Sequence, residues 1–531
     1  MKKFVSILLA AALLITAFAG CQKAGSGGET VVVGVATDLK TLDPGHMYEV
    51  YGNMVAYATY DMLFRMDGND MSKPVKSLAT DYTIDGTNTV YTFTLRDGVQ
   101  FASGNPLSSA DVVWSIRRVM SLQSSTKDHV AGISEIAAPD EKTVVITLKE
   151  PDASFLTKLA SNAFCVVDSK LMQEQGATDT QDMASDKGKA YLDQHSAGSG
   201  AYYVDSWTQN VQLVLKRNPH YWGEKTNVDT IIIKEIPDAN TQISMLEKGE
   251  IDAALTLNND NIGQLEGKDG VVIKKGQTAI TTFLMMNRDA SIGKEMANPA
   301  VEQAVRYAID YKGLKELCGD GASLPLNIVP EGFVGAKNKA DTYQDVAKAK
   351  ELMKQAGYEQ GFSVNMTVAN YDSEGMQWTT IAQKIQRDLE AINIDVNIQT
   401  AEIGVVIDDM RQGKLPFLLM HWSPDYYDIN NQLVFLPGNM VATERVKWAS
   451  DSSNARMAEL GKLIEGESNY EKRAQYAQEL QDLLDADSPY AFLLQHPKAY
   501  AVSSRLENVT YNDVAKLQLA DLAVATSSSQ Q

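Results

Sequence analysis

The fold class is decided by residues 362–398, FSVNMTVANYDSEGMQWTTIAQKIQRDLEAINIDVNI. Apolar and polar residues alternate from Phe362 to Val368 and again from Ile394 to Ile398, which predicts two half-buried strands. Between them, four apolar residues recur at helical spacing: Ile381, Ile385, Leu389 and Ile392. A strand, a helix and a strand predict a βαβ crossover with parallel strands, and therefore an α/β protein.

A second unit of the same kind precedes it in the chain. Residues 230–233 are β-branched and predict a strand, residues 238–248 predict a helix that ends at Gly249, and residues 251–257 predict the next strand. We expect the two units to belong to two different sheets. The sequence therefore predicts two α/β lobes.

Other segments carry clear local signals. Residues 31–35 and 90–95 are short runs of strand-forming residues next to turn residues. Ser108 and Asp111 have the spacing of a capping box at the start of a helix, and Asn298-Pro299 is typical of a helix N-terminus. Strands and helices are thus expected to alternate through most of the chain.

The N-terminus has the pattern of an export signal. Lys2 and Lys3 precede an apolar run that ends at Ala19 and is short for a membrane span, so residues 1–20 are predicted to be a signal peptide. The small residues before Cys21 resemble a bacterial lipoprotein signal, which implies that Cys21 is lipidated; ordinary cleavage to an unanchored protein is the alternative. Residues 21–29, which are rich in Gly and Ser, are predicted to be a flexible tether.

Size and charge limit the possible classes of protein. Removing 20 of the 531 residues leaves 511, which implies two or three domains. The net charge of −20 becomes −22 without the two signal lysines, which argues against a nucleic-acid partner. Beyond Cys21 only Cys165 and Cys318 remain, too few for a disulfide framework, and both are expected to be buried as small apolar residues.

The sequence contains none of the common catalytic motifs. The Gly263–Asp269 segment lacks the spacing and the hydroxyl residue of a phosphate loop, and no HExxH zinc motif or nucleophile elbow occurs. The six histidines are scattered, although a metal site that combines His46 and His421 is conceivable. We therefore expect a protein that is not an enzyme and has no cofactor and no metal.

Several motifs resemble one known family. The segments YTFTLRDGVQF (91–101), NPL (105–107) and ADVV (110–113) resemble a signature of the peptide and nickel class, family 5, of solute-binding proteins of ABC transporters. Further matching segments follow in the family's order: LDP (42–44), GSGAY (198–202), RNPHYW (217–222), GEID (249–252), VRYAID (305–310) and AGY (356–358). Together these motifs are specific for the family, but they do not specify the ligand.

The resemblance implies an architecture. Members of this family have the two-lobed periplasmic-binding-protein type II fold with an extra subdomain inserted in lobe one. Lobe one is then expected to comprise residues 30–275 and 495–531, with the inserted subdomain at about residues 60–190. Lobe two would comprise residues 276–494. On this layout Cys165 and Cys318 lie in different lobes.

The resemblance also implies a function. The chain would capture short peptides in the cleft between its lobes and deliver them to an ABC permease, as a lipid-anchored monomer on the extracytoplasmic face of the cell membrane. Four alternatives stay open: an oligosaccharide ligand, a metal chelate, an extracytoplasmic peptidase, and a receptor that reports ligand to a sensor.

The candidate ligand site is the segment FLLMHWSPDYYD, residues 417–428. Its apolar part predicts a buried strand, and in open α/β sheets ligands bind beyond the carboxyl ends of strands. The segment also resembles the family's Trp-x-x-Asp-Tyr motif at Trp422, Asp425 and Tyr426. The resemblance implies that Asp425 binds the α-ammonium group of a peptide, that Trp422 walls a side-chain pocket, and that Ser423 offers main-chain hydrogen bonds. A proline that is common after the acidic residue is missing here.

The exit of the first strand supplies the remaining candidates. After LDP (42–44), the resemblance places ligand-facing residues at Tyr48 and Val50. An offset of one residue would assign Glu49 instead.

Overall fold

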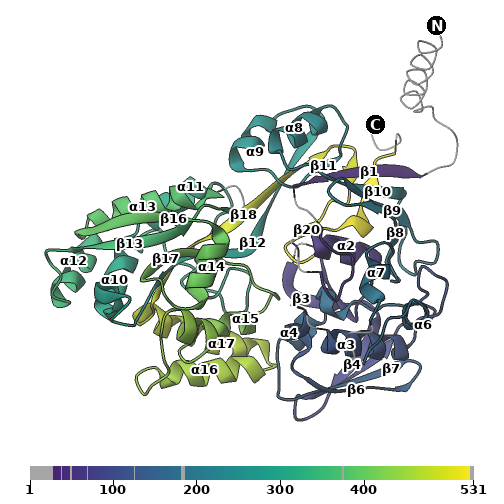
Figure 1. Ribbon diagram of the computed structural model, residues 1–531, viewed down its shortest axis with the longest axis horizontal. Helices are drawn as coiled ribbons and strands as arrows, with labels where there is room; N and C mark the ends of the chain where they lie inside the picture. The colour runs from purple at the N-terminus through teal and green to yellow at the C-terminus, as the bar shows by residue number, and fades with distance from the viewer. Residues whose placement is uncertain are drawn as a thin grey trace, which may run out of the picture.

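The computed structural model describes residues 28–36, 39–47, 49, 51–68, 70–122, 124, 126–180, 186–373 and 376–526. Within these ranges strands and helices alternate and form two halves side by side (Figure 1). None of the helices in these ranges is long and apolar enough to cross a membrane. The predicted signal peptide, Cys21 and most of the tether lie outside the described residues.

One ten-stranded sheet runs through both halves. Its strands, from one edge to the other, are β16 (Ile394–Ala401), β13 (Phe362–Ala369), β17 (Phe417–Trp422), β12 (Val271–Met286), β18 (Tyr490–Ser503), β11 (Ala253–Ala254), β1 (Glu29–Val35), β10 (Val228–Glu235), β9 (Gln212–Arg217) and β8 (Tyr202–Thr208). Strand β1 is parallel to β10 and β11, and β13 is parallel to β16, whereas β12 and β18 are antiparallel to each other. The sheet is therefore mixed.

The prediction of two separate sheets is wrong. The reason is the length of β12 and β18, which have 16 and 14 residues. The early part of β12 pairs with the end of β18, and its later part pairs with the start of β18 and with β17. Their pairing is irregular between Gln277 and Thr281, where the two halves meet. These long strands join the sheet of one half to that of the other.

Both predicted βαβ units are confirmed. In the first, β10, α8 (Ala239–Glu247) and β11 place their two strands on either side of β1, and the Asp238 side chain caps the helix by accepting from the Thr241 N–H at 2.7 Å. In the second, β13 and β16 are parallel and α13 (Trp378–Glu390) connects them. Strand β11 is shorter than expected, since only Ala253 and Ala254 pair as a strand.

A smaller sheet belongs to the first half. Its order is β4 (Ala79–Ile84), β5 (Val90–Leu95), β7 (Thr143–Leu148) and β6 (Ile133–Asp140). Helix α3 (Ser109–Ser121) packs against it and begins with the predicted capping box of Ser108 and Asp111. This sheet has its own apolar core, which includes Phe93, Ile116 and Ile146. It lies within the range expected for the inserted subdomain.

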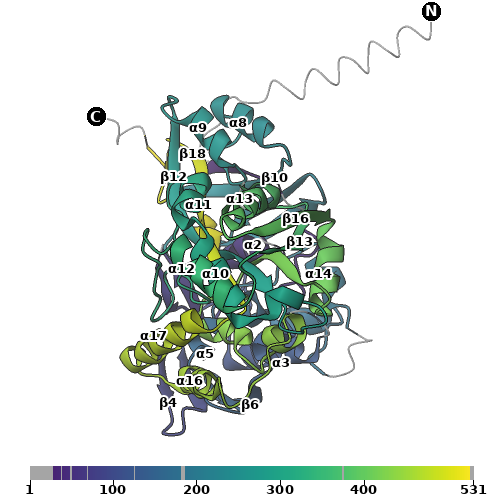
Figure 2. The ribbon, with the colours of Figure 1, turned by 90° about the vertical axis from the view of Figure 1, so that its left-hand side faces the viewer.

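Helices surround the sheet. In the second half these are α10 (Pro299–Ala308), α11 (Tyr311–Cys318), α12 (Val346–Gln355), α14 (Ile403–Arg411), α15 (Ile429–Gln432), α16 (Ala455–Gly466) and α17 (Tyr470–Ala486). The first half adds α2 (Gly52–Thr59), α4 (Lys127–Val130), α5 (Phe155–Lys158), α6 (Ser169–Glu174), α7 (Gly188–Leu192) and α9 (Asn259–Leu265). Figure 2 turns the second half toward the viewer and shows α16 and α17 below β13 and β16.

Local signals fix several of these elements. The Asn298 side chain accepts from the Ala300 N–H at 2.9 Å, and Pro299 occupies the first turn of α10, as predicted.

Cys165 and Cys318 are both buried and unbridged in the described structure, which agrees with the expectation of small apolar residues.

Candidate functional site

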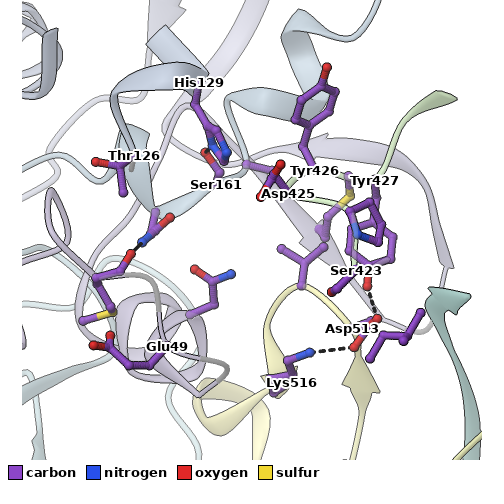
Figure 3. A pocket seen from close by; sticks show the side chains of 18 of the residues that line it. Glu49, Thr126, His129, Ser161, Ser423, Asp425, Tyr426, Tyr427, Asp513 and Lys516 are labelled. Atoms are coloured by element: carbon purple, nitrogen blue, oxygen red, sulfur yellow. Dashed lines mark hydrogen bonds and ion pairs between the residues drawn. The ribbon is translucent and has the colours of Figure 1, made fainter. Parts of the chain in front are cut away.

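A cavity of about 340 Å³ lies between the two halves. Its lining comes from the first half through α4, α5 and residues 160–162, and from the second half through the end of β17 and the residues that follow (Figure 3). Ile280 of β12 also lines it, at the place where the pairing of β12 with β18 is irregular. This volume is within the range of small-ligand sites.

Three of the predicted site residues meet at this cavity: Ser423, Asp425 and Tyr426. Strand β17 is buried from Phe417 to Met420 and ends at Trp422, so the polar segment begins where the strand leaves the core. The side chains of Ser423 and Asp425 are exposed to this space. The strand end thus places polar groups at the cavity, as the sequence predicts.

Trp422, unlike these three residues, is not among the residues that line the cavity. Its indole packs edge-on against Phe435, with ring centroids 5.1 Å apart, and its Nε1–H donates to Asn431 Oδ1 at 3.2 Å. Alternate residues of a strand face opposite sides, and here His421 and Ser423 face the cavity. This lining gives no support to Trp422 as a pocket wall.

Asn431 connects Trp422 to Asp425. The Asn431 Oδ1 atom also accepts from the Asp425 N–H at 3.3 Å, and its Nδ2 donates to Asp425 Oδ2 at 3.3 Å. Asn431 belongs to α15, and its side chain is buried. The backbone and carboxylate of Asp425 are therefore oriented by one amide that is itself held by Trp422.

A buried ion pair fixes the base of this segment. Arg473 of α17 donates from Nη1 to Asp428 Oδ2 at 2.7 Å and from Nη2 to Asn430 Oδ1 at 2.7 Å, and its Nη2 also donates to Asp428 Oδ1. Asp428 accepts in addition from the Asn430 N–H at 2.8 Å and so caps α15. Arg473 and Asp428 are 6% and 8% exposed. Such a network holds the 423–430 segment in one arrangement.

The first half supplies the facing wall. His129 of α4 bonds through Nδ1 to Ser161 Oγ at 2.8 Å, and its ring lies edge-on to Tyr426 with centroids 6.0 Å apart. The Lys158 ammonium lies over the ring face of Tyr426, 4.7 Å from its centroid, in a cation–π contact. The aromatic residue after Asp425 thus bridges the two halves.

Acidification is expected to destabilise the protein through His129. Burial lowers the pKa of His129; the Asp425 carboxylate opposes this, and Lys158 adds to it. The folded state then binds the proton less tightly than the unfolded chain, whose imidazole titrates near pH 6.5, so the free energy of unfolding should fall as the pH drops below about 6.5. Urea unfolding at about pH 7.5 and about pH 5.5 measures this difference. His129→Gln should reduce it, and an unchanged difference in that variant would refute the assignment to His129.

The C-terminal segment completes the cavity. Asp513 and Lys516 flank the turn between β20 (Tyr511–Asn512) and β21 (Lys516–Leu517), and both line the cavity. Asp513 is 1% exposed on its side chain and accepts from the Tyr427 hydroxyl, from the Ala279 N–H at 3.0 Å and from the Lys516 ammonium at 2.6 Å. Burial alone would raise the pKa of Asp513, but Lys516 and these hydrogen bonds lower it. Through these hydrogen bonds, Asp513 connects Tyr427 of the second half, Ala279 of β12 and Lys516 of the C-terminal loop.

The exit of β1 reaches the same cavity. Glu49, the alternative assignment, lines it together with Met47 and Asn53. Tyr48 and Val50, the predicted residues, lie outside the described residues.

His46 and His421 have different surroundings in the folded chain. His46 Nδ1 lies 3.0 Å from Asp43 Oδ2, whereas the His421 ring packs edge-on to Tyr371 and Trp378. Among the residues that the structure describes, no three His, Cys, Asp or Glu side chains form a group that could hold a metal ion.

A family model matches most of the chain. The match covers residues 73–440 and the family is described as bacterial extracellular solute-binding proteins, family 5. The chain belongs to this family. Membership agrees with the resemblance in the sequence motifs and with the two-lobed α/β architecture.

Known proteins are similar to this chain over nearly its whole length. The probable D,D-dipeptide-binding periplasmic protein DdpA of Escherichia coli K12 is 27% identical over 500 residues, which cover 91% of this chain and 92% of that protein. The structure of HbpA2 from Haemophilus parasuis superposes with a TM-score of 0.82 at 20% identity and covers 94% of this chain and 100% of that one. The binding protein DppA from Helicobacter pylori, in complex with the peptide STSA, gives a TM-score of 0.74 at 23% identity and covers 94% of this chain and 98% of that one. The type II periplasmic-binding fold is thereby established.

Sequence reasoning missed much of the facing wall. His129, Ser161, Asp513 and Lys516 were not among the predicted site residues, yet all line the cavity. They lie in a short helix, in loops and at the start of the two-residue strand β21, without a periodic pattern or motif. No local signal in the sequence marks them.

Proposed function

We propose that this protein is the extracytoplasmic solute-binding component of an ABC importer, and that it captures short peptides in the cavity between its halves. The observation that carries the proposal is the position of Asp425 at a cavity lined by both halves. Relatives named for dipeptide binding, and a neighbour in complex with a peptide, support the ligand class. The protein binds its ligand and does not change a covalent bond.

Asp425 would bind the α-ammonium group of the peptide. Ser423, exposed beside it, would offer main-chain donor and acceptor groups, as in β-strand addition, which satisfies a peptide backbone without reading its sequence. Tyr426 would contact the ligand's first residues, and Tyr48 and Val50 or Glu49 would contribute from the other side. Trp422 would position Asp425 through Asn431.

Binding would close two lobes by a hinge. Lobe one would comprise residues 30–275 and 495–531, with an inserted subdomain at about 60–190, and lobe two would comprise residues 276–494. The irregular pairing between Gln277 and Thr281 supports a hinge there. Contacts across the cleft, such as the Ala153 N–H to Glu465 O at 2.8 Å, would stabilise the closed form that docks on the permease.

Calorimetric titration tests the ligand class. Mixed di- to pentapeptides should give saturable heat, whereas cello- and xylo-oligosaccharides should not. Mass spectrometry after long incubation should recover each peptide intact. Heat from a sugar with none from any peptide would reject the ligand class, and peptide fragments would reject a binding role without chemistry.

Lipidation of Cys21 would hold the protein at the membrane as a monomer on the extracytoplasmic face. The signal-like residues 1–20 support this proposal. Cys21→Ser should move the protein from the membrane fraction to the soluble extracytoplasmic fraction, and the mature wild type should carry a lipid mass on its first residue. Identical fractionation of both forms would refute the anchor.

A further inference from the structure

The two halves also meet away from the ligand cavity, at the loop that precedes α5. The Asn430 Nδ2 group of α15 donates to Asp152 Oδ1 at 3.1 Å, and the Ala153 N–H donates to Glu465 O at 2.8 Å. These four described residues do not belong to the lining of the ligand cavity. Each contact joins the first half to the second, so the pair of contacts holds the halves together without touching a ligand in that cavity.

Asn430 is held in place by its own half. It is 9% exposed, and its Oδ1 accepts from Arg473 Nη2 at 2.7 Å. Because an arginine side chain has only donors, the amide oxygen faces Arg473 and the amide NH₂ points the other way, toward Asp152. The same NH₂ group donates to Glu465 O at 3.2 Å. The donor is therefore oriented by contacts within the second half.

Asp152 is held in place by the first half in the same way. Its Oδ1 accepts from the N–H and the hydroxyl of Ser154 at 2.9 and 2.5 Å, and its Oδ2 accepts from the Lys158 ammonium at 2.6 Å. Burial alone would raise the pKa of Asp152, but Lys158 and Ser154 lower it, so the carboxylate stays charged. Because both partners are oriented within their own halves, their contact costs little side-chain entropy when the halves close.

A further contact between the halves lies at the surface. Lys73 of β3 (Asp70–Lys76) lies over the ring of Tyr470 of α17, 5.0 Å from its centroid. Tyr470 is 48% exposed, and a cation–π contact at an exposed site is weak. A hydrogen bond to a charged group is stronger when that group is largely buried, and the Asp152 side chain is 20% exposed. We therefore expect the pair of Asp152 and Asn430 to contribute more than the exposed contact.

The same short helix also serves the ligand site. Asn431, the neighbour of Asn430 in α15, binds the backbone N–H and the carboxylate of Asp425. On the first half, the Lys158 ammonium that pairs with the facing carboxylate also lies over the ring of Tyr426. Each end of the contact between the halves thus has a direct neighbour at the ligand segment.

We propose that Asp152 and Asn430 form a latch, which closes the halves without a contact to the ligand and lengthens the time for which any bound ligand is held. This inference rests on the proposed function, because it requires two lobes that open and close. Since the latch does not touch the ligand, it slows the release of different ligands by the same factor. Asn430 is then a positioning residue that acts through closure.

Amide exchange tests the latch in the absence of any ligand. The Ala153 N–H donates across the cleft, so its hydrogen–deuterium exchange reports how often the halves separate. Asn430→Asp keeps an acceptor for Arg473 and replaces the donor that faces Asp152 by a second carboxylate. Exchange at Ala153 should become faster by about tenfold or more. Asp152→Ala should also accelerate it, and provides the test if Asn430→Asp does not fold by circular dichroism.

Release of trialanine tests the effect on a bound peptide. In surface plasmon resonance, Asn430→Asp should raise the dissociation rate by about tenfold or more, and by the same factor for N-acetylated trialanine. The double variant Asp152→Ala/Asn430→Asp removes the repulsion between the two carboxylates. It should release the peptide no faster than Asp152→Ala alone, because the two residues act through one contact.

Asn454→Asp is the matched control. Asn454 is 3% exposed, its Nδ2 donates to Ala449 O at 3.0 Å, and its Oδ1 accepts from the Asp451 N–H at 2.9 Å. All three residues belong to the second half. This variant should change neither exchange at Ala153 nor the release of trialanine.

The outcomes separate the latch from the proposed function. Exchange at Ala153 that is as fast in the wild type as in an unstructured chain would overturn the latch, as would unchanged exchange or unchanged release in the folded variants. In each of these cases peptide binding itself would stand. If the wild type binds no peptide, the proposed function fails, and exchange at Ala153 still decides whether the latch exists.

Discussion

Asp425→Asn is expected to weaken the binding of peptides with a free amino terminus by about 10- to 150-fold, which corresponds to about 1.5–3 kcal/mol for a hydrogen bond to a charged group. The Asn side chain is nearly the same size, so the change removes the charge and leaves the shape of the segment. Because a bound ligand would cover the Asp425 carboxylate, the loss should exceed that of a pair that stays on the surface. Calorimetry with a free tripeptide measures it.

The N-acetylated form of the same peptide isolates the charge. It carries no ammonium group, so its affinity should change little between the wild type and Asp425→Asn. Asp320→Asn serves as the control, because Asp320 is 91% exposed on its side chain and does not line the cavity. Equal loss for the free and the acetylated peptide would show that Asp425 acts through structure and not through its charge.

Arg473→Met should lower the free energy of unfolding by about 3–5 kcal/mol, the cost of leaving one partner of a buried ion pair without the other. The change would remove the three hydrogen bonds that Arg473 donates to Asp428 and Asn430, and the one from its Nε to Ile464 O at 2.9 Å. Asp428 would remain buried as an unpaired carboxylate. Urea or guanidinium unfolding measures the loss.

The same variant should reduce peptide binding. Asp428 caps the helix that carries Asn431, and Asn431 orients Asp425, so release of Asp428 disturbs the ligand side of the segment. Arg456→Met is the matched control, because Arg456 forms a comparable two-bond pair with Glu479 at 2.8 and 2.9 Å on the surface, where its side chain is 44% exposed. That exposed pair should contribute about 1 kcal/mol or less. Similar losses for the two variants would contradict a special role of the buried pair.

The elements of this protein could be predicted from the sequence because their signals are local. The alternation in residues 362–368 and 394–398 reports which side of a strand is buried, and the cap at Asn298-Pro299 reports where a helix begins. The end of β17 could also be predicted, since the change from Phe417–Met420 to the polar residues after Trp422 marks the place where the chain leaves the core. That local change in polarity, together with the resemblance to the family's Trp-x-x-Asp-Tyr motif, predicts that Ser423 and Asp425 lie at the site.

Pairing between distant segments could not be predicted in this way. A hydrophobic pattern shows that a strand has a buried face, but not which strand lies beside it, so the single sheet follows only from the length and register of β12 and β18. The direction of Trp422 was likewise decided by Phe435 and Asn431, which approach it in the folded chain.

The sequence by itself determined the succession of strands and helices, the family, and the polar segment at the end of β17. Only the tertiary structure decided which groups face that segment: His129 and Ser161 from the first half, and Lys516 from the C-terminal loop. The physical reason is that a strand end is defined by neighbours in the chain, whereas the opposite wall of a cavity is built from residues far apart in the chain that only folding brings together.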